Sequence, residues 1–211
     1  EIPTVYPPLA QLLFAGLAAL GAGPHGFRLA FGALDFAVVI ALRHLAQGLG
    51  LPRHRWVLYG WNPLAVLETA GSGHVEPAGV LLVVLASGWI IRPSRAAASA
   101  LALGAAVQVK LLPLVLVPGS VRRLPSPHVL LLGLAMAIPA LPYAVSGPPL
   151  GAGTVAYAAR WEHNAIVFPL VRDALAWADT GRSLQPGITA IRSTVGLAWF
   201  PWELVYRAAW P

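Results

Sequence analysis

Three ionisable side chains that are close in the sequence, Glu68, His74 and Glu76, form the densest group that could do chemistry. A glycine-rich break, Gly71-Ser72-Gly73, separates the first from the other two. Carboxylates and imidazoles bind metals, but two helical ligands share one face only at i, i+4 spacing, which His74 and Glu76 lack. We therefore expect no metal site. Two interpretations stay open: hydrogen bonding to sugar hydroxyls or phosphate, or a structural break between half-helices.

Two further charges, Asp35 and Lys110, interrupt long apolar runs. A charge at membrane depth is costly, so each is expected to have a partner. Asp35 is interpreted as structural, bonded to a neighbouring helix or to a cation such as Lys110. For Lys110 the alternatives are a bound anion, a buried carboxylate or a residue that is simply tolerated. A phosphate is slightly preferred over Asp35 as its partner.

A third group combines aromatic and polar side chains: Tyr157, Arg160, Trp161 and Asn164. Trp161 offers a flat apolar face for a pyranose ring, and Asn164 can donate to and accept from hydroxyls. The guanidinium of Arg160 could instead bind two phosphate oxygens. The same composition is typical of an aromatic belt at a membrane surface, so both interpretations stay open.

The elements that must position these residues are predicted from composition. Apolar residues make up 57% of the 211 residues and charged residues only 10%, whereas a soluble domain usually carries about 25% charged residues. The net charge of +6 comes from basic residues at the ends of apolar runs, which favours lipid head groups over nucleic acid. There is no Cys, which excludes disulfides, thiolate metal sites and a Cys nucleophile.

The apolar runs predict an all-α transmembrane bundle with several short or broken helices. Helices satisfy their own backbone groups in lipid, and the runs lack the alternation of a membrane barrel. The chain is interpreted as one transmembrane domain, residues 1–211, with spans at about 8–23, 27–49, 56–70, 77–91, 96–117 and 129–145. Residues 147–187 are expected to be interfacial or extramembrane, and residues 188–210 could form a further span.

The basic loops conflict with this count of spans. The positive-inside rule assigns the loops at residues 53–55, 92–95 and 122–123 to the cytoplasm. Simple crossings place consecutive loops on opposite sides. Either some segments are re-entrant, or the rule is violated twice.

Several short motifs, taken in order, resemble a known family. They are Tyr6-Pro7-Pro8-Leu9, Asp35, Tyr59-Gly60-Trp61-Asn62-Pro63-Leu64, Glu68, Gly73-His74-Val75-Glu76, Val109-Lys110-Leu111-Leu112-Pro113, and Tyr157, Trp161 and Asn164. Together they resemble the membrane glycosyltransferases of the type-C fold, in particular mannosyltransferase-like members that use polyprenyl-phosphate sugars. The resemblance covers nearly the whole chain.

The resemblance implies a multi-pass enzyme of the cell membrane, here the bacterial plasma membrane. It would move a mannose-like hexose from a polyprenyl-phosphate carrier to a lipid or glycan acceptor on the extracytoplasmic side. Its expected partners are membrane lipid, the lipid-linked donor and a glycan or glycolipid acceptor, with no nucleic acid and no cofactor held by the chain. The implied substrate-binding residues are Tyr6, Glu68, His74, Glu76, Lys110, Tyr157, Arg160, Trp161 and Asn164.

In the family the catalytic carboxylate precedes the Tyr-Pro-Pro segment, so the catalytic residue is expected upstream of Glu1. The chain is accordingly interpreted as a fragment that is inactive alone. The alternative function is a transporter or flippase, because broken helices and charges at membrane depth also mark transporters. No inverted repeat is visible in the sequence, which counts against that alternative.

Overall fold

The computed structural model describes residues 4–52, 54–146 and 153, and within them every regular element is a helix. The helices belong to one compact unit, Tyr6–Leu150. In chain order they are α1 (Pro8–Ala19), α2 (Pro24–Gly48), α3 (Val57–Gly60), α4 (Pro63–Val66), the π-helix η1 (Leu67–Gly71), α5 (Glu76–Trp89), η2 (Pro93–Arg95), α6 (Ala96–Val109), η3 (Leu112–Leu116), α7 (Val117–Val121), α8 (Ser126–Ala137), η4 (Ile138–Ala140) and α9 (Leu141–Ser146). The predicted all-α class is confirmed for these residues.

Proline and glycine set the ends of the first two helices. Each begins with a proline at its first turn, where the missing N–H costs no hydrogen bond. Each also ends on a glycine in the left-handed region, Gly21 with φ 78° and Gly50 with φ 66°. The amides of Gly21 and Ala22 donate to the carbonyls of Ala18 and Leu17, a Schellman arrangement that satisfies the last carbonyls of α1.

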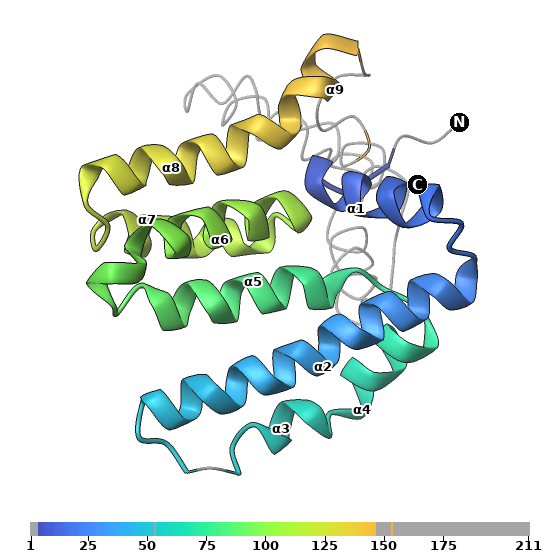
Figure 1. Ribbon diagram of the computed structural model, residues 1–211, viewed down its shortest axis with the longest axis horizontal. Coiled ribbons are helices and arrows are strands. Elements are labelled where there is room, and N and C mark those ends of the chain that lie inside the picture. The colour runs from blue at the N-terminus through green and yellow to red at the C-terminus, as the bar shows by residue number, and fades with distance from the viewer. Residues whose placement is uncertain (1–3, 53, 147–152, 154–211) are drawn as a thin grey trace, which may run out of the picture. The chain divides into compact units, whose positions relative to one another are not determined.

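The long helices lie side by side in the order α2, α5, α6, α8 (Figure 1). Two apolar clusters hold them together. The first joins α5, α6 and α8 around Ala86, Ala100, Leu103 and Leu132, and the second joins α1, α2, α5 and α6 around Ala10, Phe31, Ala78 and Val109. Half of these eight core residues are alanine, which lets the helices approach each other closely.

Helices α6 and α8 run in the same direction. Gly104 lies against the carbonyl of Leu132, and one turn further along both helices Gln108 donates a hydrogen bond to the carbonyl of Met136. The chain must therefore return between the two helices, and it does so through η3 and α7. Leu124, just after α7, is back in the apolar cluster at the start of α6.

Helices α2 and α5 also run in the same direction. Phe31 packs near Val75 at the starts of the two helices, and Leu45 meets Gly88 near their ends. Here the return is made by α3, α4 and η1. Figure 1 shows these short helices following α2 back toward its beginning.

As a result, the loops after α2, α5 and α7 all lie at one end of the unit, which we call the arginine end. It carries Arg43, Arg55, Arg92, Arg95, Arg122 and Arg123. The conflict between the basic loops and the expected spans is removed by a reversal inside residues 96–117. There α6 stops at Val109, and Lys110 is extended, with φ −151° and ψ 142°.

Within the described residues, two helices are long and apolar enough to cross a membrane: α2, with 25 residues, and the helical stretch Ser126–Tyr143, with 18. Only 17% of the most apolar window of α2, and 6% of that of Ser126–Tyr143, is buried inside the protein. A core helix of a water-soluble protein would be mostly buried. Shorter apolar helical stretches are Pro8–Ala19, Glu76–Trp89 and Leu112–Val121.

The expected spans divide differently in the structure. Residues 56–70 form α3, α4 and part of η1 rather than one helix. The expected interfacial segment, residues 147–187, and the further span, residues 188–210, lie outside the described residues apart from Gly153.

Candidate functional site

The opposite end of the unit, which we call the polar end, carries Glu68, His74, Glu76 and Lys110. Glu68 lies in η1, whose i→i+5 turns are a feature found often at functional sites. After η1 the chain turns at Gly73, where φ is 73°, and α5 then begins at Glu76. This sharp turn brings His74 between the two carboxylates.

The imidazole of His74 faces both glutamates. Its Nδ1 lies 3.1 Å from Oε2 of Glu68 and 3.7 Å from Oε2 of Glu76. The His74 and Glu68 side chains are 44% and 47% exposed, so both are open to solvent or a ligand. Both contacts are to Nδ1, which carries at most one hydrogen, and the shorter distance favours Glu68 as its acceptor.

Lys110 reaches the same group from the far end of α6. Its ammonium donates to Oε1 of Glu76, across a sequence separation of 34 residues. The pair forms because α5 and α6 are antiparallel, so the start of one lies beside the end of the other. Neighbouring side chains at the polar end are thus in contact in the order Glu68, His74, Glu76 and Lys110. Lys110 keeps 50% of its side chain exposed.

The second oxygen of Glu76 is buried and has no hydrogen-bond partner among the described residues. A buried carboxylate oxygen without a donor is costly. Nδ1 of His74 lies 3.7 Å from this oxygen, beyond hydrogen-bond distance, so a small movement of the imidazole would supply a donor.

An apolar cavity of about 370 Å³ adjoins the ion pair. Glu76 and Lys110 form its polar edge, and its walls come from α5 and η3: Gly79, Val80, Val83, Leu112, Pro113, Val115 and Leu116. A ligand that fills this space would have its apolar part between the two segments and its polar part at the ion pair. That arrangement suits an amphiphile.

Tyr6 lies beside the polar end rather than within it. Its ring packs edge-on against Phe14, with centroids 5.2 Å apart, at the margin of the cluster that contains Val75 and Val109. These two valines are the chain neighbours of Glu76 and Lys110.

Asp35 and Lys110 are not partners. The hydroxyl of Tyr59 donates to Oδ1 of Asp35 at 2.6 Å, in the middle of α2, while Lys110 is held by Glu76. The sequence pattern singled out Asp35 and Lys110 as needing partners, but it could not choose between them. The identity of each partner depends on the return of the chain along α2 and on the reversal after α6.

The remaining expected site residues, Tyr157, Arg160, Trp161 and Asn164, lie outside the described residues. Within residues 4–52 and 54–146, no three His, Cys, Asp or Glu side chains converge closely enough to hold a metal ion. Comparison with protein-family models, curated proteins and solved structures gave no match.

Proposed function

We propose that the chain is a multi-pass membrane protein with its arginine end in the cytoplasm. Large apolar side chains on its outer faces support this, among them Leu29, Leu58 and Leu130, which are 75%, 81% and 65% exposed. Apolar surface of this extent is rare on a soluble monomer. Six arginines gathered at one end match the excess of basic residues in cytoplasmic loops.

On this placement the polar end faces the other side of the membrane. We propose that it binds a sugar linked to a polyprenyl phosphate, and that the protein transfers the hexose to a lipid or glycan acceptor. The observation that carries the proposal is the Glu76–Lys110 pair at the edge of an apolar cavity. A polyprenyl phosphate has the matching chemistry, an isoprenoid chain ending in an anion. The resemblance to type-C glycosyltransferases points to the same substrate.

Each group of the polar end has a role in this proposal. Lys110 exchanges Glu76 for the donor phosphate, which stabilises the charge on the leaving group. Glu68 and His74 hydrogen-bond the sugar hydroxyls. In the transfer itself, the acceptor oxygen bonds to C1 of the hexose as the C1–O bond to phosphate breaks, and a general base takes the hydroxyl proton.

Transfer by the full-length protein tests the proposal. Membranes containing it should move radiolabelled hexose from a polyprenyl-phosphate donor to an extractable acceptor. His74→Ala should lower the rate by roughly tenfold, because the sugar loses a contact that orients it. His25→Ala is the matched control, since His25 is an exposed histidine at the start of α2. Equal rates for both variants would remove the polar end from the reaction.

A transporter or flippase is the second candidate. The observation that favours it is the broken path of α3, α4 and η1, because discontinuous helices line transporter sites. Proteoliposomes separate the two functions. A flippase would move a fluorescent polyprenyl-phosphate sugar between leaflets without forming a glycosylated product, whereas the transferase would form product only when acceptor is present.

A further inference from the structure

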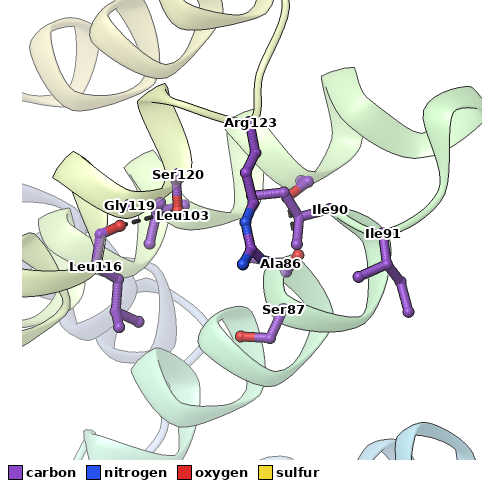
Figure 2. Close-up of a pocket in the computed structure, with 10 residues that line it drawn as sticks. Ala86, Ser87, Ile90, Ile91, Leu103, Leu116, Gly119, Ser120 and Arg123 are labelled. Carbon is purple, nitrogen blue, oxygen red and sulfur yellow. Dashed lines mark hydrogen bonds between the residues drawn. The ribbon is translucent and has the colours of Figure 1, made fainter. Parts of the chain in front are cut away.

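A second cavity, of about 270 Å³, lies at the arginine end between α5, α6 and α7. Figure 2 shows the Arg123 side chain extending into it toward Ala86 and Ser87. The apolar lining of the cavity includes Ile90, Ile91 and Leu116, and Leu116 and Ile91 lie on opposite sides of Arg123 in Figure 2. This cavity is distinct from the one at the polar end, although Leu116 borders both.

The polar groups of this cavity divide into two kinds. Ser99 donates to the carbonyl of Ala86 at 2.8 Å, and Ser120 donates to that of Leu116 at 2.9 Å, so both hydroxyl protons are used. The side chains of Arg123 and Ser87 form no ion pair or hydrogen bond with any residue in the described part of the chain, although the backbone amide of Arg123 donates to the Ser120 carbonyl. The cavity therefore presents a guanidinium and one hydroxyl to a ligand.

The surrounding charge is entirely positive. Arg92, Arg95 and Arg122 lie at the same end, and the three acidic residues of the described part, Asp35, Glu68 and Glu76, lie in the middle or at the polar end. Arg123 is exposed and has no carboxylate beside it among the described residues, so its guanidinium is free to bind water or an anion from outside them. A guanidinium binds phosphate through two parallel hydrogen bonds, which makes phosphate the best fit.

We propose that this cavity binds one anionic phospholipid of the cytoplasmic leaflet. Arg123 holds the phosphate, Ser87 donates a further hydrogen bond, and the acyl chains start along the apolar lining on the two sides of Arg123, Ile90 with Ile91 on one side and Leu116 on the other. Ile91 and Leu116 are 53% and 41% exposed, so the apolar wall opens outward, where lipid chains would continue it. Basic pockets between membrane helices on the cytoplasmic side bind lipid head groups in this way. The inference rests on the membrane placement proposed above and not on sugar transfer.

Native mass spectrometry of the whole chain in detergent, titrated with dioleoylphosphatidylglycerol, tests this. The wild-type chain should retain one lipid preferentially, and Arg123→Gln should raise the apparent Kd roughly fivefold or more. Ser87→Leu should do the same, because it fills the cavity and keeps every charge. The matched control is Arg122→Gln, which removes an equal charge from the adjacent residue, one that does not line the cavity. It should change the Kd less than twofold.

Three results would overturn the proposal. Equal weakening by Arg122→Gln and Arg123→Gln would show attraction by the overall positive charge and no specific site. Equal retention of dioleoylphosphatidylcholine would show that the net charge of the lipid is not recognised. Displacement of the lipid by millimolar inorganic phosphate would assign the cavity to a free anion. Circular dichroism and size-exclusion profiles matching the wild type establish that the variants are folded.

Discussion

The two ends of the helical unit both carry charge, but only one of them compensates it internally. At the polar end Lys110 is held by Glu76, and His74 lies 3.1 Å from Glu68. At the arginine end six guanidiniums gather without a carboxylate among the described residues. Paired charges cost less to keep at membrane depth, whereas unpaired ones need water or lipid phosphate. On the proposed function, the difference separates an end that holds a ligand among its own groups from an end that meets the membrane surface.

The contrast between the two ends assumes that the loops after α5 and α7 lie on the same side of the membrane. Labelling of introduced cysteines tests this assumption and should give the largest effect that we predict. The chain has no cysteine, so single cysteines at Ser94, Ser126 and Ser72 report their own position. In sealed vesicles a membrane-impermeant maleimide should label Ser94→Cys and Ser126→Cys from one side and Ser72→Cys from the other. Labelling of Ser94→Cys and Ser126→Cys from opposite sides would mean that the chain does not reverse at Lys110.

The two ends keep their places in the unit only while α6 and α8 stay closely packed. A Cβ on Gly104 would lie 2.5 Å from Cβ of Ala135 and 2.9 Å from the carbonyl oxygen of Leu132. Gly104→Leu should therefore lower the free energy of unfolding by about 3 kcal/mol, because the helices must move apart. SDS-induced unfolding followed by circular dichroism measures this. Gly133→Leu, on α8 with nothing within 4 Å, should stay within about 0.5 kcal/mol of the wild type.

Replacing the lysine at the polar end tests whether its pairing serves the ligand. In the full-length protein Lys110→Met should cut hexose transfer at least tenfold, about 1.4 kcal/mol in the barrier, because the leaving phosphate loses its cation. The double variant Lys110→Met with Glu76→Gln removes the uncompensated carboxylate as well. If this double variant regains wild-type transfer, Lys110 serves only to neutralise Glu76.

The Asp35–Tyr59 pair lies between the two ends, so we expect its loss to affect stability and not hexose transfer. Tyr59→Phe removes one hydrogen bond to a charged acceptor and should lower the unfolding free energy by roughly 1–2 kcal/mol. Transfer by the folded variant should change less than threefold, since the pair is far along α2 from the polar end. A larger fall in transfer at unchanged stability would extend the site into the middle of the unit.

Part of this organisation could be predicted from the sequence. The expected spans at about 8–23 and 27–49 lie close to α1 and α2, and Glu68, His74 and Glu76 are near neighbours in the chain. Helix ends and groups of this kind depend on residues that are close together in the sequence. The pairing of Lys110 with Glu76 could not be predicted, because it depends on two antiparallel helices that bring residues 34 positions apart together. The reversal at Lys110 was hidden because residues 96–117 are apolar on both sides of the lysine, and hydropathy does not record direction.

The π-helix η1 makes the polar end sensitive to chain length as well as to residue identity. Its i→i+5 turns hold one residue more than α-helical turns would. Deleting one residue, for example Ala70, would let the segment close as an α-helix and rotate everything before it by about 100° relative to α5. Glu68 would then turn away from His74, although no residue of the group had been replaced. In this segment a single-codon deletion is thus a more drastic mutation than most substitutions, and variants that differ in length here would differ in the composition of the polar end.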